Sequence, residues 1–160
     1  MTTGRGQSSR RLGPYRLVTA VGVAAGVVLV DQLTKWWAVS RLSHGPIHVI
    51  GTLDLELTRN SGASFSILQG STGFLVVVVV AAAVVLSVLA WRSATAGRAA
   101  IYGLILGGAL GNLVDRLFRG GSVVDFVALH FWPTFNVADA CVVVGCALLI
   151  VSLLRGARPG

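Results

Sequence analysis

The segment GFLVVVVVAAAVVLSVLAW, residues 73–91, contains no charged side chain, and Ser87 is its only hydroxyl residue. A helix that crosses a membrane needs about 20 mostly apolar residues at a rise of about 1.5 Å each. The segment has that length and ends on Trp91, a residue type that is favoured at the membrane interface. We therefore expect a membrane-spanning helix whose side chains face lipid.

Three further apolar blocks flank this segment, at residues 17–39, 99–118 and 137–154. The whole chain is 54% hydrophobic and 12% charged, with a mean hydropathy of +0.80, which places it outside the range of soluble globular domains. The expected fold class is an all-α membrane protein with four transmembrane helices. The three flanking blocks contain polar residues, which are expensive to bury in lipid, so we expect these helices to line any functional site.

Charge is distributed unevenly between the two ends of the four expected helices. Eight of the 13 Lys and Arg residues, and none of the six Asp and Glu, fall on the side that holds both termini. By the positive-inside tendency both termini are cytoplasmic and the polar residues face the extracytoplasmic side. We expect a disordered basic tail over residues 1–16, one four-helix domain over 17–155, and a short cytoplasmic tail over 156–160. The positive charge then reports topology and contact with membrane lipid, and it requires no nucleic-acid partner.

The connection between the first two expected helices, residues 40–72, is long. Leu53, Leu55 and Leu57 alternate with polar residues there, which is the period of a half-buried strand, and Gly51 and Gly62 mark turns. We expect a small extracytoplasmic β element between helices 1 and 2 that rests on the membrane surface.

The third block has informative spacing. Gly103, Gly107 and Gly111 recur every four residues, which favours close helix packing, and Asp115 falls next on that row. The adjacent row brings Asn112 and Arg116 together. One interpretation is a packing groove that ends in an interfacial ion pair.

Two more carboxylates follow this block. Asn136 and Asp139 open the fourth block and have a structural interpretation as a helix cap, because Asn is a favoured N-cap and an acid is stabilised in a first helical turn. Asp125 precedes them in a connection that must return to the same membrane surface. Two carboxylates at close range cannot both stay ionised, so one can activate water while the other protonates a leaving amine.

Metal and thiol chemistry find little support in the sequence. His44, His48 and His130 lack the spacing of a zinc site, so we expect no metal and no cofactor. Cys141 and Cys146 lie on one expected helix at a separation too long for good disulfide geometry, and we interpret them as packing residues.

Three alternatives remain open at this point. Ser61 or Ser64 with Lys35 is a possible Ser/Lys catalytic pair. A small proton-coupled transporter would also carry intramembrane Asp, Asn and Arg, although such sites tend to lie near the midplane whereas the acids here lie toward one face. A structural scaffold would explain the glycines and leave the Asp pair without a role.

Five motifs together resemble the lipoprotein signal peptidase family, the bacterial signal peptidase II enzymes of aspartic peptidase family A8. They are DQLTKWW (31–37), LTRNSGASFS (57–66), GGALGNLVDR (107–116), GSVVDF (121–126) and FNVADACVVVG (135–145). The resemblance implies an intramembrane aspartic endopeptidase with four helices and cytoplasmic termini. Its partner would be a lipid-modified prolipoprotein, whose signal peptide it removes by cleaving before the diacylglyceryl-modified Cys.

The resemblance also implies roles for individual residues. Asp125 and Asp139 match the catalytic pair. The residues that match supporting or substrate-facing positions are Asn60, Gly62, Asn112, Asp115, Arg116 and Asn136. Asp31 and Lys35 are four apart on a helix and can pair with each other, so we interpret them as structural support. Asp115 is expected to hold Arg116 or the neighbouring loop, and we expect the protein to act as a monomer.

Overall fold

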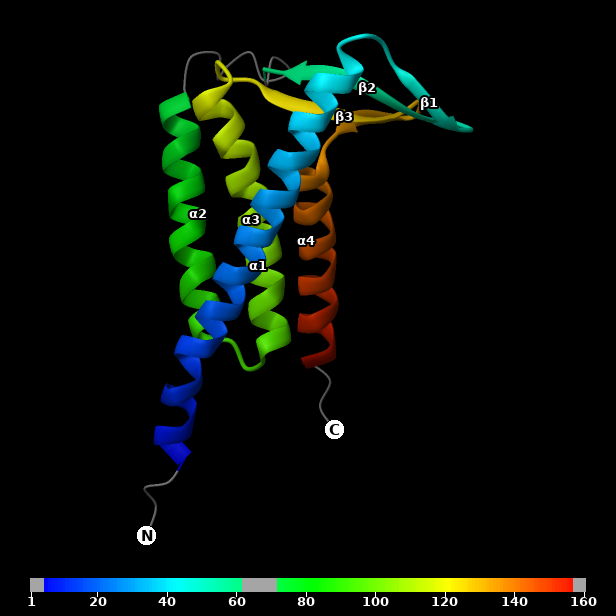
Figure 1. The fold of residues 1–160 in the computed structure, drawn as a ribbon. Coiled ribbons are helices and arrows are strands. Elements are labelled where there is room, and N and C mark those ends of the chain that lie inside the picture. Colours follow the sequence, from blue (N-terminus) through cyan, green and yellow to red (C-terminus); the bar gives the residue numbers. More distant parts are fainter. Residues whose placement is uncertain (1–4, 62–71, 157–160) are drawn as a thin grey trace.

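The computed structural model describes residues 5–61 and 72–156 and shows a helical bundle with a small sheet at one end (Figure 1). The helices are α1 (Arg5–Leu42), α2 (Thr72–Arg92), α3 (Ala96–Phe118) and α4 (Val137–Gly156). The strands are β1 (Ile47–Ile50), β2 (Leu53–Asn60), β3 (Val123–Leu129) and β4 (Trp132–Phe135). Helix α1 begins and helix α4 ends at the end of the bundle opposite the sheet (Figure 1).

Three of the four helices are long and apolar enough to cross a membrane: α1 over Gly13–Leu42, α3 over Ala96–Phe118, and α4 over Val137–Arg155. The part of α2 that qualifies as apolar within the described residues, Val76–Arg92, is shorter. Three helices thus have the length and composition that the multi-span prediction requires, and the fourth span remains a prediction.

The first helix is longer than expected, because α1 begins at Arg5 and not near residue 17. Residues 5–16 were expected to form most of a disordered tail and are instead helical. Extending a helix that already exists adds one hydrogen bond for each residue fixed, without a new nucleation step. The long apolar part of α1 therefore allows the basic segment to continue as helix.

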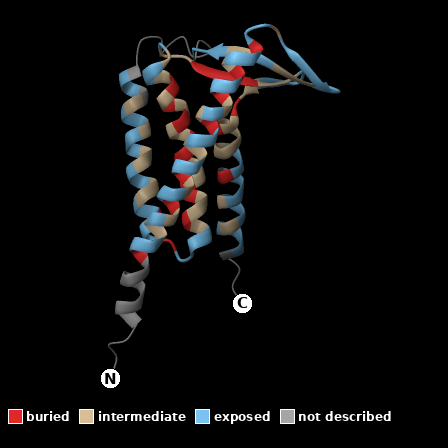
Figure 2. Ribbon diagram, in the orientation of Figure 1, coloured by how far each residue is buried: buried red, intermediate tan, exposed pale blue. Residues whose placement is uncertain are grey.

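The central helix of the bundle is α3, which packs against α1, α2 and α4. Its glycines allow this, because a Cβ at Gly103 would meet the backbone of Ala20 on α1 and a Cβ at Gly108 would meet the backbone of Ala138 on α4. Gly107 likewise lies against Ala24 on α1. The expected glycine packing face is confirmed, and buried positions gather on the inside of the bundle (Figure 2).

The sheet is larger than predicted. Four antiparallel strands follow the order β1-β2-β3-β4, so the connection between α3 and α4 supplies half of them. The prediction of a β element from residues 40–72 alone was incomplete for a physical reason. Gly120 and Gly121 adopt φ of +68° and +82°, a left-handed turn that reverses the chain after α3, and β3 can then pair along β2.

The sheet is fixed to the bundle by a small apolar cluster. Ala38 and Leu42 at the end of α1 pack with Phe126 of β3, and Leu55 and Leu57 of β2 join them. The alternating leucines thus form a half-buried strand, as their period predicted.

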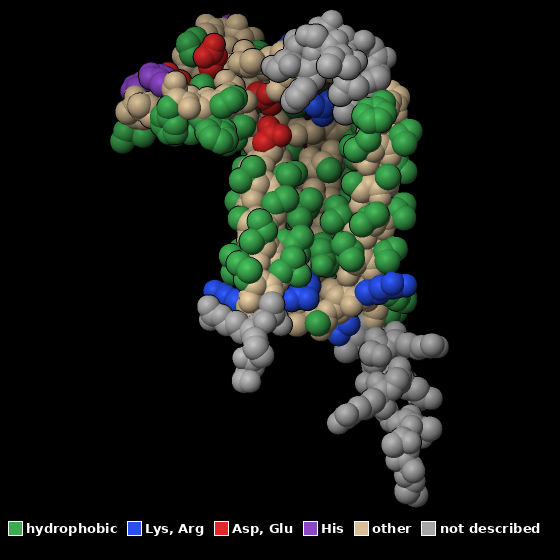
Figure 3. All heavy atoms as spheres, turned by 180° about the vertical axis from the view of Figure 1, so that it is seen from behind, with side chains coloured by type: hydrophobic (Ala, Val, Ile, Leu, Met, Phe, Trp, Pro, Cys, Tyr) green, Lys and Arg blue, Asp and Glu red, His purple; other side chains and the backbone are tan. Residues whose placement is uncertain are grey.

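Charged groups are distributed unevenly between the two ends of the molecule. On the face seen in Figure 3, acidic side chains lie only at the sheet end, beside a Lys or Arg side chain, and most Lys or Arg side chains line the opposite end, with an apolar zone between the two ends. Arg16 donates to the carbonyl oxygens of Ser93 and Ala94 between α2 and α3, and Arg98 donates to Ser152 of α4. These bonds join the helices at the basic end.

Candidate active site

Asp125 and Asp139 lie at the junction of the sheet and the bundle. Asp125 is on β3 and 2% exposed, and Asp139 is in the first turn of α4. Two amide side chains connect them. Asn136 Nδ2 donates to Asp125 Oδ1 at 2.6 Å and to Asn112 Oδ1 at 3.1 Å, and Asn112 Nδ2 donates to Asp139 Oδ1 at 2.7 Å. Residues that are distant in the sequence therefore form one polar network around both carboxyls.

The structure also shows the helix cap that the sequence predicts for Asn136 and Asp139. The Asp139 amide donates to Asn136 Oδ1 at 2.9 Å, and the Asn136 amide donates to Asp139 Oδ2 at 3.2 Å. This reciprocal pair satisfies two backbone donors at the start of α4. It also fixes the Asp139 carboxylate, because one oxygen is held by the cap and the other by Asn112. The cap and a chemical role are compatible.

A buried ammonium group supports this network from α1. Lys35 Nζ lies 2.9 Å from Asp31 Oδ2, 3.1 Å from Asp115 Oδ2 and 3.0 Å from Asn112 Oδ1, and all three charged side chains are 0% exposed. The predicted pairing of Asp31 with Lys35 is confirmed. An ammonium has three N–H donors and Lys35 uses each of them, which orients the Asn112 amide so that its nitrogen points to Asp139.

Both carboxylates around Lys35 also hold backbone groups. Asp31 Oδ1 accepts from the Ala138 amide at 2.9 Å, so α1 reaches the first turn of α4. Asp115 Oδ2 accepts from the Val124 amide at 2.9 Å, which ties α3 to the residue beside Asp125. The expectation that Asp115 holds the neighbouring loop is confirmed.

Two contributors were not identified from the sequence. Arg119 Nε lies 3.3 Å from Asp115 Oδ1, whereas Arg116 donates to the Asn112 carbonyl at 3.2 Å. Besides Lys35, the ion-pair partner of Asp115 is thus Arg119, the residue that follows α3; of the two partners expected for Asp115, the neighbouring loop is confirmed and Arg116 is wrong. Gln32 donates to Asp31, Asp115 and the Gly111 carbonyl. A polar residue beside Asp31 in an apolar block could have identified it as part of the site from the sequence.

The environment of Asp125 changes its acidity. Burial raises the pKa of Asp125 above its ordinary value of 3.8, and the negative charge of Asp139 adds to the rise. Hydrogen bonds from Asn136 and Asn60 and the positive charge of Lys35 act in the opposite direction. The net rise makes Asp125 a carboxyl that retains a proton at higher pH than an exposed Asp.

Two cavities meet the carboxyl pair. One of about 280 Å³ is lined by Asp125, by β2 residues that include Asn60, and by Thr134 of β4. The other, of about 310 Å³, is lined by Asp139, by aromatic residues of the β3–β4 segment and by α4. The first is lined about equally by polar and apolar surface, and the second is apolar apart from Asp139. The structure therefore brings Asn60 to the Asp125 side, while Gly62 lies outside the described residues.

The alternative Ser/Lys pair is disfavoured by these contacts. A lysine that acts as a base needs a free amine, and Lys35 is engaged with two carboxylates and an amide oxygen. Ser61 lines the same cavity as Asp125, and Ser64 lies outside the described residues.

The histidines on the sheet bond to an acid outside the pair. His48 Nδ1 and His130 Nε2 hydrogen-bond to Asp54 on the sheet, at 2.6 and 3.1 Å, and these bonds lower the pKa of Asp54. Among the described residues no group of His, Cys, Asp and Glu is suited to hold a metal ion. Cys141 and Cys146 carry free thiols.

Comparison with known proteins identifies related chains. The family model described as Signal peptidase (SPase) II, of peptidase family A8, matches residues 23–155. A lipoprotein signal peptidase of Rhodococcus jostii is 46% identical over 145 residues, covering 86% of this chain and 73% of the relative. A lipoprotein signal peptidase of Mycobacterium avium is 43% identical over 150 residues, covering 89% of this chain and 82% of the relative.

The fold also matches solved structures. Two chains, each described as a bacterial membrane enzyme, superpose with TM-scores of 0.75 and 0.77 at 28% and 30% identity. The matches cover 89% and 86% of this chain and 93% of each solved chain. The arrangement of helices and sheet is therefore one that an experimental structure contains.

Proposed function

Because the chain belongs to the signal peptidase II family, whose members are proteases that process lipoproteins, we propose that it removes the signal peptide from diacylglyceryl-modified prolipoproteins by cleaving before the lipidated Cys. The observation that carries the proposal is the pair of carboxyls, Asp125 and Asp139, held on one amide network at the end of the bundle. A two-aspartate site supports hydrolysis without a metal or a covalent intermediate.

In the proposed mechanism a water molecule lies between the two carboxyls and the scissile carbonyl. One carboxylate takes a proton from this water as its oxygen attacks the carbonyl carbon. The protonated partner gives its proton to the amine of the lipidated Cys when the C–N bond breaks. The products are a signal peptide with a new carboxylate and a mature lipoprotein with a free amino terminus. Burial raises the pKa of Asp125, which favours Asp125 as the carboxyl that holds the proton.

The surrounding residues hold this pair in position. Asn112 donates to Asp139 and Asn136 donates to Asp125, so an amide holds each carboxyl in place. Arg116 supports the pair indirectly, by donating to the Asn112 carbonyl. Asn60 is assigned to the wall of the Asp125 cavity that faces the substrate. Gly62 is assigned a supporting or substrate-facing role by its place in the sequence motif.

We further propose that α2 is the fourth membrane span, that both termini are cytoplasmic and that the sheet and carboxyl pair face the extracytoplasmic side. Cations that join the helices at the end opposite the sheet, Arg16 and Arg98, support this orientation. The protein would act in the bacterial cytoplasmic membrane as a monomer surrounded by lipid. A reporter fused at the carboxyl terminus should be cytoplasmic and one inserted near Thr52 extracytoplasmic, and finding both on the same side would overturn the topology.

The activity is tested with purified protein and a prolipoprotein substrate whose Cys carries diacylglycerol. Mass spectrometry should show two products that separate before the modified Cys. The same precursor without the lipid serves as the control and should be cleaved far more slowly. Absence of both products at any enzyme concentration, from protein that is folded by circular dichroism, would contradict the proposal.

A further inference from the structure

The apolar cavity beside Asp139 has an arrangement that suggests what occupies it. Phe131, Trp132 and Phe135 of the β3–β4 segment form one wall, and Val143 and Val144 of α4 form the other. Val143 and Val144 are 66% and 50% exposed and belong to a helix apolar enough to span the membrane, so the cavity opens toward lipid. Asp139 is its one charged lining residue.

The two cavities beside the carboxyl pair differ in the polarity of the side chains that line them. The side that Asp125 lines offers hydroxyl and amide groups of Thr58, Asn60 and Thr134, which suit a peptide backbone in water. The side that Asp139 lines offers aromatic rings and aliphatic side chains. A substrate that spans both must be polar at one end of its scissile bond and apolar close to the other.

A lipidated Cys meets this requirement by its chemistry. Its amine is part of the scissile bond, and its sulfur is joined to the glyceryl group only a few bonds away, so the acyl chains must begin next to the carboxyl pair. The mature peptide leaves toward water, whereas the chains must stay on the membrane side. Resting on the proposed function, we propose that the cavity between the β3–β4 segment and α4 holds an acyl chain of the substrate's diacylglyceryl-cysteine and positions the scissile bond at Asp139.

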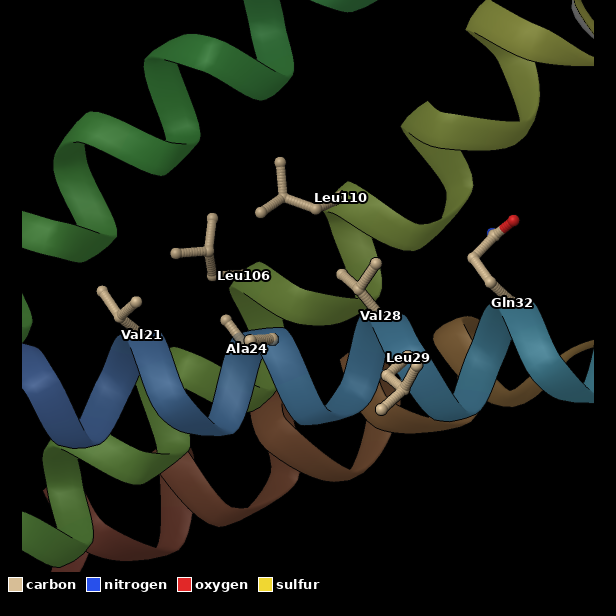
Figure 4. Close-up of a pocket in the computed structure, with 8 residues that line it drawn as sticks. Val21, Ala24, Val28, Leu29, Gln32, Leu106 and Leu110 are labelled. Atoms are coloured by element: carbon tan, nitrogen blue, oxygen red, sulfur yellow. The ribbon is translucent and has the colours of Figure 1, made fainter.

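A larger cavity competes for the same role. It measures about 520 Å³ and lies between α1 and α3, lined by Val21, Ala25 and Leu29 of α1 and by Leu106 and Leu110 of α3 (Figure 4). Its lining includes neither Asp125 nor Asp139, and its one polar residue is Gln32, whose amide is turned to Asp115. An acyl chain bound there would not lie beside either carboxyl of the pair and so would not position the scissile bond. The smaller cavity is therefore the better match.

Binding of an acyl chain in this cavity is expected to position the scissile bond and to add little to the affinity for the substrate. An acyl chain that moves from lipid into an apolar cavity exchanges one apolar environment for another and gains little hydrophobic free energy. Misplacing a reacting bond by about 1 Å can lower a rate by about 100-fold. Filling the cavity should therefore reduce turnover of substrates whose chains need the space, and spare substrates whose chains do not.

The first test compares two synthetic prolipoprotein substrates that differ only in having long or short acyl chains. Val143→Phe and the milder Ala140→Leu should lower kcat/KM for the long-chain substrate relative to the short-chain one by about tenfold. The matched control is Ala25→Phe, which fills the larger cavity and should leave the ratio unchanged. Wild-type cleavage of both substrates verifies the proposed function separately. Variants that cleave both substrates in the wild-type ratio, or a shift caused by Ala25→Phe, would overturn the proposal.

A second test does not depend on turnover. The Asp125→Asn protein is mixed with a long-chain substrate that carries a photoreactive group at the end of one acyl chain, and the labelled peptides are identified by mass spectrometry. Label is expected within residues 129–144. Label confined to α1 and the middle of α3, or labelling that excess long-chain substrate does not compete away, would count against an acyl site in this cavity.

Discussion

Replacing Lys35 by Met tests whether the buried charge cluster holds the bundle and the site together. The Lys35 side chain is fully buried and lies 2.9 Å from Asp31 and 3.1 Å from Asp115. Met retains much of the volume and removes the positive charge, so two buried carboxylates would lose their shared partner. Breaking a buried ion pair in this way costs about 3–5 kcal/mol of unfolding free energy.

The size of the effect can be expressed as a shift in unfolding temperature. For a domain of 150–250 residues, 1 kcal/mol corresponds to about 2–4 °C, so Lys35→Met should lower the Tm by about 10 °C. Arg119 provides the matched control, because it also contacts Asp115, at 3.3 Å, but is 26% exposed. A partly exposed ion pair contributes about 0–1 kcal/mol, so Arg119→Gln should lower the Tm by less than about 4 °C.

The assay is thermal unfolding of the purified proteins in one detergent, followed by circular dichroism and by tryptophan fluorescence. Lys35→Met should also cleave more slowly at temperatures where it is folded, because Asn112 loses the bond that orients its amide toward Asp139. A Tm for Lys35→Met within about 3 °C of wild type, or a loss in Arg119→Gln of equal size, would refute the reasoning from burial.

Three further changes have expected outcomes that follow from single features. Gly108→Ala should lower the unfolding free energy by about 1–3 kcal/mol, because the new Cβ meets the backbone of α4. Gly26→Ala is the control and should not lower it, because a Cβ at Gly26 meets nothing within 4 Å. Equal Tm values for the two variants would contradict this reasoning. Cys141→Ala with Cys146→Ala should retain cleavage and resist thiol reagents, and a folded but inactive double variant would indicate a thiol mechanism. Asp125 binds its proton more tightly when folded than when unfolded, so its contribution to stability is complete below pH 3.8 and is lost as the pH rises through the raised folded pKa. Asp125→Asn should therefore gain stability over wild type as pH increases, and a difference in Tm that does not change with pH would contradict the assignment.

The features that depend on local spacing could be predicted from the sequence. The apolar block at residues 73–91 indicated a helix by its length and composition, and the four-residue separation of Asp31 and Lys35 placed both on one face. Asn136 and Asp139 have the spacing of a helix cap, and the structure shows both hydrogen bonds of that cap. In each case the interacting groups lie within a few residues of each other.

The features that depend on tertiary packing could not be predicted in the same way. Pairing of β3 with β2 joins Asn60 to Val123 across the whole of α2 and α3, so no local pattern specifies it. The pairing of Asp115 with Arg119 is an exception: residues four apart share a helix face whereas neighbours such as Arg116 do not, so this partner could have been predicted from spacing. The contact of Lys35 with Asn112 requires the close approach of α1 and α3, which the glycines permit but do not specify in register.

The most direct test of the two-aspartate site measures cleavage of a lipid-modified prolipoprotein by Asp125→Asn, Asp139→Asn and the double variant, with membrane levels and Tm determined for each. Asn has nearly the size of Asp but cannot exchange the proton, so both single variants should insert and fold while cleavage falls below detection. Residues that act as one unit are not additive, so the double variant should be little worse than either single variant. Asp54→Asn, at an acid on the sheet that is bonded to two histidines, is the control and should remain active. Near wild-type turnover in either Asp125→Asn or Asp139→Asn would contradict the mechanism.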